Sequence, residues 1–230
     1  MPQPFDITVI TPTTGKPSLD RLAASIDAQS PGGTIFHLLL WDQMRDSAVR
    51  SPQSYDSERR LSLVLPAGLG RNANAPGSPL RAVGLMTATT PWVTFADDDV
   101  RWDAGHIAAL ADAAQGVRWA STLRTIWTPA GERLGVDRFE SVGDDPGRRV
   151  PYEMCDNNTM VFRRELGTAA AVLFRETRGY NDDRLMYRFL KPPAAGAARP
   201  ESPPSTTPAR TGSSLSFARS ARRISRSTSS

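Results

Sequence analysis

Three consecutive carboxylates, Asp97, Asp98 and Asp99, follow an apolar stretch in the segment PWVTFADDDVRW. Adjacent like charges repel one another, and a partly buried strand end tolerates them only beside a compensating cation. A divalent metal is one such cation, and a metal held by few protein carboxylates commonly binds a phosphate-bearing substrate as well. The alternative is a solvated turn in which Asp99 or Asp103 caps the following helix. The segment therefore predicts either a metal and phosphate site or a solvated turn.

The elements that would position these acids alternate along the chain. Residues 5–11 alternate in polarity and are rich in β-branched side chains, which indicates a strand that Pro12 should end. Residues 34–41 form a continuous apolar run, as is typical of a central parallel strand. We expect further strands at 61–65, 91–96, 118–127 and 158–163, helices at 19–29, 80–88, 104–115, 165–174 and 181–190, and a hairpin or mobile loop at 128–145. This alternation predicts an α/β fold with a mostly parallel central sheet and helices on both faces.

Four polar clusters come at the ends of expected strands: residues 11–13, Asp42, residues 68–74 and residues 97–99. In open α/β sheets, ligands bind beside the carboxyl ends of the strands, near the switch in strand order. We therefore expect the four clusters to lie along one edge of the sheet and to form one site.

Length and composition exclude several classes of protein. A chain of 230 residues predicts one domain with a sizeable core, and it holds no run of apolar residues long enough to span a membrane. Cys155 is the only cysteine and no export signal is apparent, so we expect a cytoplasmic protein without an intrachain disulfide. With only His37 and His106, a three-histidine zinc site is excluded.

Residues 192–230 differ in character from the rest of the chain. They are dominated by Pro, Ala, Ser, Thr, Gly and Arg, and they bury too little apolar surface to offset their ordering entropy. Six arginines against one glutamate give this segment a charge of +5, so residues 1–191 carry −1 of the total of +4. We therefore expect a domain at 1–191 without a specific nucleic-acid surface and a disordered, basic tail at 192–230.

The order of five segments resembles an inverting nucleotide-sugar glycosyltransferase of the GT-A fold, of the family-two type. The segments are VITPTTGKP, GRNANAPGSPLRAVGL, WVTFADDDVRW, CDNNTMVFRREL and NDDRLMYRFL, and the resemblance covers about residues 7–190. It implies a Rossmann-like GT-A fold, a donor sugar linked to UDP or GDP, an acceptor that the residues do not identify, and Mn²⁺ or Mg²⁺. Asn181 stands where the family has glutamate, and the tail replaces the family's next elements, which suggests a chain truncated or altered there.

The same resemblance implies roles for single residues. The nucleotide-sugar would be bound by Thr11, Pro12, Thr13, Asp42, Arg71, Asn72, Asp97 and Asp98. The metal would be held by Asp99 and Asp97, which alternation along a strand would place on the side opposite Asp98. Asp182 would be the base that accepts the proton of the acceptor hydroxyl, with Asp183 as the alternative. Asn157 and Asn158 would contact the acceptor.

Other interpretations stay open at the level of the sequence. Asp182 could match the charge of a helix N-terminus, Arg71 could be a surface residue, Asp42 a turn residue, and Asn157 and Asn158 could satisfy a backbone bend. A sugar nucleotidyltransferase also combines a Rossmann-like sheet with a metal and aspartates, but it needs a glycine-rich basic loop where this chain has TPTTGKP. A third interpretation is a truncated, non-catalytic relative whose basic tail binds anionic surfaces.

Overall fold

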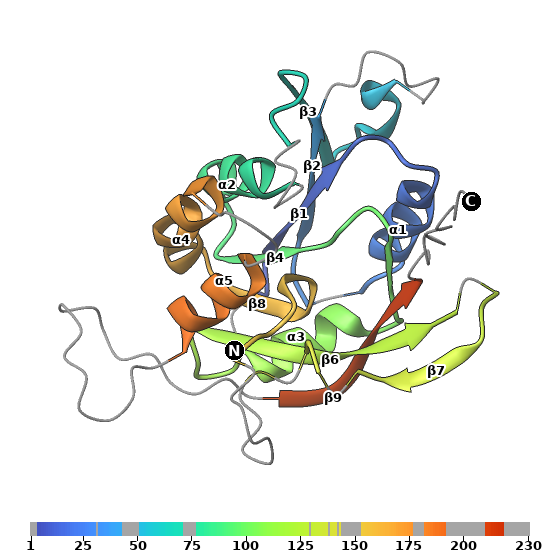
Figure 1. The fold of residues 1–230 in the computed structure, drawn as a ribbon, viewed down its shortest axis with the longest axis vertical. Helices are drawn as coiled ribbons and strands as arrows, with labels where there is room; N and C mark the ends of the chain where they lie inside the picture. The colour runs from blue at the N-terminus through green and yellow to red at the C-terminus, as the bar shows by residue number, and fades with distance from the viewer. Residues whose placement is uncertain are drawn as a thin grey trace, which may run out of the picture.

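The computed structural model describes residues 4–30, 32–42, 51–70, 77–128, 130–137, 139–141, 143, 153–176, 182–191 and 210–218. Within these residues, nine strands form one mixed sheet in the order β3-β2-β1-β4-β8-β6-β9-β5, with β7 paired to β6 (Figure 1). The predicted α/β fold, with a sheet that is mostly parallel at its centre, is confirmed. No helix in the described segments combines the length and the apolar character needed to cross a membrane.

The parallel half of the sheet consists of β1 (Ile7–Thr13), β2 (Ile35–Asp42), β3 (Arg60–Leu65) and β4 (Trp92–Phe95). β1 lies between β2 and β4, and β3 pairs with the far side of β2. The apolar run of β2 is explained by burial on both faces, because successive side chains of a strand point in opposite directions. Leu39 belongs to one hydrophobic core, whereas Leu38 and Leu40 belong to the other.

Pro12 does not end the first strand as predicted, because β1 continues to Thr13. Beyond Ile10, β1 pairs only with β2, since β4 has already ended at Phe95. The carbonyl of Ile10 accepts from Ala96 N, so the backbone of Ile10, and of Pro12 two residues later, faces the side of β4. The missing N–H of Pro12 therefore falls where no neighbouring strand requires a donor.

The other half of the sheet contains β5 (Val100–Trp102), β6 (Trp119–Trp127), β7 (Arg133–Val136) and β8 (Met160–Arg163). β8 is antiparallel to both β4 and β6, and β6 and β7 form the hairpin that was one of the two alternatives for residues 128–145. The strand β5 was not predicted, because three residues are too few to establish an alternating pattern.

Helices cover both faces of the sheet, as predicted (Figure 1). One face carries α1 (Ser18–Asp27) and α3 (His106–Ala113), and the other carries α2 (Ser78–Thr87), α4 (Arg164–Glu176) and α5 (Asp182–Leu190). Two short 3₁₀ helices, η1 (Pro52–Tyr55) and η2 (Asn157–Thr159), lie in connections. α2 lies close to the sheet at Gly84, where a Cβ atom would come within 2.5 Å of the Ile10 side chain.

The structure describes one segment of the tail. The backbone of residues Arg210–Ala218 forms β9, which pairs parallel with β6 and antiparallel with β5. The edges of two strands offer unpaired backbone donors and acceptors, and these can recruit a segment that forms little core of its own. The rest of the tail lies outside the described residues.

Candidate functional site

The three consecutive aspartates lie in a turn and not on the strand. β4 ends at Phe95, and Val100 N donates to Asp97 O at 3.1 Å. Strand alternation therefore does not set the directions of the three side chains. Asp98 and Asp99 both contact Lys16, whereas Asp97 pairs with Arg81, so the strand alternation that predicted Asp97 and Asp99 on one side does not apply to this turn.

Arg81, in the first turn of α2, connects the acidic turn to α5. Its guanidinium pairs with Asp97 and also donates to Asp182 Oδ2 at 3.1 Å, and Ser78 Oγ donates to the same oxygen at 2.7 Å. Burial opposes the charge of Arg81, but Asp97, Asp182 and Asp183 outweigh it and raise the arginine's pKa. Burial likewise opposes ionisation of Asp97, yet Arg81 and hydrogen bonding hold its pKa below the ordinary value. The pair is therefore ionised at neutral pH.

Lys16, in the loop after β1, is the second cation at the acidic turn. Its Nζ lies 2.8 Å from Asp98 Oδ1 and 3.4 Å from Asp99 Oδ2. Thr13 Oγ1 donates to the other oxygen of Asp98 at 2.8 Å, so both oxygens of this buried carboxylate are bound. Asp99 remains half-exposed, and burial together with the charge of Asp97 raises its pKa despite Lys16.

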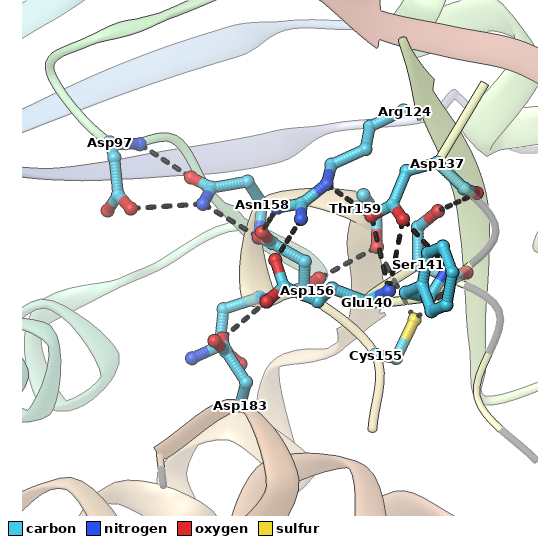
Figure 2. Close-up of polar contacts among 12 residues, drawn as sticks. Asp97, Arg124, Asp137, Glu140, Ser141, Cys155, Asp156, Asn158, Thr159 and Asp183 are labelled. Atoms are coloured by element: carbon cyan, nitrogen blue, oxygen red, sulfur yellow. Dashed lines mark hydrogen bonds and ion pairs between the residues drawn. The ribbon is translucent and has the colours of Figure 1, made fainter. Parts of the chain in front are cut away.

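The two asparagines of η2 reach the same cluster, and Figure 2 shows Asn158 beside Asp97. Asn158 Oδ1 accepts from Asp97 N at 2.6 Å, and Asn158 Nδ2 donates to Asp97 Oδ2 at 3.0 Å. Asn157 N donates to Asp183 Oδ1 at 2.8 Å. Both residues are almost fully buried, and the Asn157 amide has no hydrogen-bond partner among the described residues.

The first turn of α5 supplies the two acids that are the candidates for a base. Asp182 accepts from Ser78 and Arg81, as described above. Burial, followed by the charges of Asp156 and Asp182, raises the pKa of Asp183 well above its ordinary value. A buried carboxylate with a perturbed pKa is a common feature of functional sites.

Two of the predicted nucleotide-binding residues lie at the same sheet edge but apart from the acids. Asp42 ends β2, and its Oδ1 accepts from Gly68 N at 2.6 Å. Pro12 lies against Gly77, where a Cβ atom would be 3.1 Å from Pro12 Cβ and 3.5 Å from Arg81 Nη1. Asp42 and Pro12 therefore contact the chain that precedes α2, at Gly68 and at Gly77.

One other predicted residue is turned away from the site, and two lie outside the residues that the structure describes. The hydroxyl of Thr11 is buried and lies 2.9 Å from His37 Nε2, so the structure turns this side chain into the core. Arg71 and Asn72 lie outside the described residues. Among the described residues, Arg81 is the arginine that contacts Asp97 and Asp182. Its burial could have been inferred from the sequence, because Leu80, Gly84 and Leu85 lie on the same face of α2.

The acid cluster fits a metal only in part. Among the described residues, no group of three or more His, Cys, Asp or Glu side chains is arranged to hold a metal. Asp97 and Asp98 have both carboxylate oxygens bound by protein donors. Asp99 is the accessible carboxylate, and Mg²⁺ typically needs only one or two such ligands beside substrate phosphates. Asp99 therefore fits the proposed metal, whereas Asp97 is bound to Arg81 and Asn158.

The chain matches no protein-family model and no curated protein sequence. Its fold is shared with TarS from S. aureus, a staphylococcal glycosyltransferase. TarS residues 1–349 superpose with a TM-score of 0.57 at 17% identity, covering 80% of this chain and 55% of TarS. A longer TarS structure gives 0.62 at 15% identity, covering 94% and 37%, and a complex of TarS 1–349 with UDP-GlcNAc gives 0.55 at 17%, covering 80% and 53%. The chain spans about half, or less, of the TarS structures that it matches.

Proposed function

We propose that the acid cluster binds a nucleoside-diphosphate sugar and that the chain transfers the sugar to an acceptor hydroxyl with inversion. The supporting observation is that Arg81 holds Asp97 and Asp182 together, although these acids come from elements far apart in the sequence. The fold of TarS, which has been solved with UDP and with UDP-GlcNAc, makes a UDP-linked sugar the first donor to test, with GDP as the alternative. The sequence resemblance to inverting family-two GT-A enzymes supplies the expected stereochemistry.

The two cations at the cluster suit a diphosphate leaving group. When the bond between sugar and phosphate breaks, negative charge develops on the diphosphate, and fixed positive charges stabilise it. The guanidinium of Arg81 matches phosphate oxygens with its planar fork of donors, and Lys16 supplies a mobile point charge. Asp42 and Pro12, on the same edge, would lie toward the nucleoside.

Asp182 is the proposed base. The acceptor oxygen forms a bond to the anomeric carbon, its proton passes to a carboxylate oxygen of Asp182, and the nucleoside diphosphate leaves with the electrons of the broken bond. Before the donor binds, Asp182 Oδ2 accepts from Arg81 Nη1 and from Ser78 Oγ. Once Arg81 turns to the diphosphate, this oxygen is released from the arginine and can accept from the acceptor hydroxyl. Asp183, with its raised pKa, is the alternative base.

A divalent ion is a separable part of the proposal. Asp99 would hold Mn²⁺ or Mg²⁺, and the bound ion would neutralise charge on the diphosphate. Asp98, which is saturated by Thr13 and Lys16, would act by fixing these two groups beside the donor.

One observation favours a second candidate, a sugar nucleotidyltransferase. Lys16 follows the first strand and reaches the acidic turn, as a phosphate-binding basic loop would. The products separate the candidates, because a glycosyltransferase releases UDP from UDP-GlcNAc, whereas a nucleotidyltransferase releases pyrophosphate from a nucleoside triphosphate and a sugar phosphate.

The deciding experiment measures binding and turnover in the full chain. We expect UDP with Mn²⁺ to raise the melting temperature, because a ligand at 100 times its Kd stabilises a protein by about 2.7 kcal/mol. The Asp97→Asn/Asp99→Asn double variant should lose this shift. Asp27→Asn should keep it, because Asp27 pairs with the buried Arg60 away from the cluster.

Turnover tests the base separately from donor binding. Asp182→Asn should keep the UDP-induced shift but lower UDP release from UDP-GlcNAc about a hundredfold or more. Equal shifts in wild type and the Asp97/Asp99 double variant would refute the donor site. Unchanged release in Asp182→Asn would refute the base.

A further inference from the structure

We propose that Arg124 is a positioning residue that fixes Asp97 through Asp156 and Asn158. The consequence for turnover rests on the proposed function, whereas the geometric part can be tested without it.

Arg124, on β6, is buried among three carboxylates (Figure 2). Its Nε donates to Asp137 Oδ2 at 2.6 Å, its Nη1 pairs with Asp156 and its Nη2 pairs with Glu140. Each of the three nitrogens therefore contacts a different acid. Lysine has a single nitrogen and could not reproduce this arrangement.

The three acids come from both ends of a long connection. Asp137 and Glu140 follow β7, whereas Asp156 immediately precedes η2. A backbone hydrogen bond of 2.5 Å from Asp156 N to Glu140 O joins the same two segments. Arg124 thus anchors the start of η2 to the antiparallel hairpin.

From Asp156 the contacts lead directly to the acidic turn. Asp156 Oδ1 accepts from Asn158 N at 2.7 Å and from Asn158 Nδ2 at 2.8 Å. The same Nδ2 donates to Asp97 Oδ2, and Asn158 Oδ1 accepts from Asp97 N. An ionised carboxylate only accepts hydrogen bonds, so the nitrogen of the amide must face Asp156 and Asp97. This fixes the amide in one orientation and presents its oxygen to the backbone of Asp97.

Removing Arg124 would change this arrangement in a specific way. Asp156 would remain buried near Asp97 and Asp183 without its cation, and such an acid must either take up a proton or move. Either change alters the acceptor that holds Asn158. Asp97 would then lose a defined partner on the side opposite Arg81, and the geometry between Asp97, Arg81 and Asp182 would loosen.

The test compares Arg124→Lys with Arg60→Lys. Arg60 is a matched control because it is also a buried arginine on a strand, paired with Asp27 at 2.5 Å and bonded to His37 at 3.1 Å, without a contact to the acid cluster. Hydrogen exchange of the Asp97 amide is measured in both variants, relative to the amide of Val9 in the buried centre of β1.

In Arg124→Lys we expect the relative protection of Asp97 to fall about tenfold or more, the equivalent of one charged hydrogen bond. In Arg60→Lys it should not change. Equal loss at Asp97 and Val9 in Arg124→Lys, or no loss at Asp97, would overturn the proposal, because a purely structural arginine lowers protection throughout the chain.

Kinetics add a second arm. Arg124→Lys should lower kcat for UDP release about tenfold and weaken UDP binding less than Asp97→Asn/Asp99→Asn does, because Asp97 keeps its charge and loses only its defined position. A tenfold change in KM with an unchanged kcat would contradict a positioning role for Arg124. If the wild type neither binds UDP nor releases it, the proposed function fails, and the exchange measurement still decides the role of Arg124.

Discussion

Arg81 and Arg124 are both buried arginines surrounded by acids, but they occupy different kinds of environment. The Arg81 side chain is 8% exposed, and its partners Asp97 and Asp182 are 32% and 13% exposed. Arg124 is 7% exposed, and two of its three partners, Asp137 and Asp156, are 6% and 8% exposed. The acids of Arg81 are therefore more open to solvent than most of those of Arg124.

The origin of the acids differs as well. Arg81 joins the turn after β4 to the start of α5, at the carboxyl edge of the parallel strands, where α/β proteins bind ligands. Arg124 joins segments that flank one connection, and its three nitrogens are each committed to an acid. A buried arginine beside accessible acids can exchange them for a substrate anion, whereas one enclosed by acids holds the backbone in place.

The largest effect should come from removing Arg81. Arg81→Met leaves Asp97 and Asp182 facing each other in a partly buried space, and breaking a buried pair in this way costs about 3–5 kcal/mol of unfolding free energy. Denaturant unfolding at neutral pH measures the loss. Arg81→Met/Asp182→Asn should recover much of the stability, because one of the unpaired acids is gone, but it should not recover UDP binding.

The pH dependence of this loss follows from the pKa of Asp97. That pKa is lowered in the folded state, so the paired carboxylate stabilises the fold above its ordinary pKa and loses this contribution as the pH falls. The difference between wild type and Arg81→Met should therefore narrow in acid. A difference that stays constant with pH would mean that Arg81 stabilises by packing alone, and the contrast with Arg124 would be lost.

Asp183 lies between the region around Arg81 and the region around Arg124. Its effect on the pH dependence of the unfolding free energy should be smaller than that of Asp97 and opposite in sign. Burial and the neighbouring Asp156 and Asp182 raise its pKa well above the ordinary value. The folded state then binds this proton more tightly than the unfolded state does. The contribution of Asp183 to stability is highest below the ordinary aspartate pKa and falls as the pH rises through the raised value. Asp183→Asn should flatten this fall and be more stable than the wild type at neutral pH.

A matched control separates this effect from helix charge. Glu165 is an exposed acid in the first turn of α4, where it pairs only loosely with Arg118 at 3.6 Å. Glu165→Gln should not remove the fall in stability with rising pH, and it should cost at most about 1 kcal/mol. If Asp183→Asn behaves like Glu165→Gln, then Asp183 only matches the helix N-terminus, and it does not link the two regions.

Most of the parallel half of the fold was predictable from local patterns. The double-sided burial of Leu38, Leu39 and Leu40 follows from an unbroken apolar run, which only a covered central strand accommodates. Asp42 and Asp97 were placed at one edge because strand ends in a parallel sheet point the same way. Pro12 was misjudged because its tolerance depends on where the neighbouring strand β4 ends.

The cations of the site were not predictable in the same way. The argument from like charges required a compensating cation near residues 97–99, but it did not specify a metal, and the structure supplies Arg81 and Lys16. Arg71 was assigned to the nucleotide-sugar through the family resemblance, and Arg81, which lies in an apolar helix, was not considered. The partners of Arg124 are 13, 16 and 32 residues away along the chain, and no local pattern relates them.

Lys16 is more exposed than Arg81 and Arg124, and its removal should cost the least unfolding free energy. Its side chain is half-exposed, and burial is outweighed by Asp98 and Asp99, which raise its pKa. Exposed ion pairs contribute about 0–1 kcal/mol, since water screens them and ordering a long side chain has an entropic cost. Lys16→Met should therefore lower the unfolding free energy by less than about 1 kcal/mol, and added salt should reduce the difference further.

UDP binding, measured by titration calorimetry, should weaken in Lys16→Met nonetheless. Lys16 contributes little to the stability of the free protein, but its positive charge would stabilise a bound diphosphate. A large loss of stability with unchanged UDP affinity would place Lys16 with Arg124, as a residue that holds the structure together, and would leave Arg81 as the cation available to the donor among the described residues.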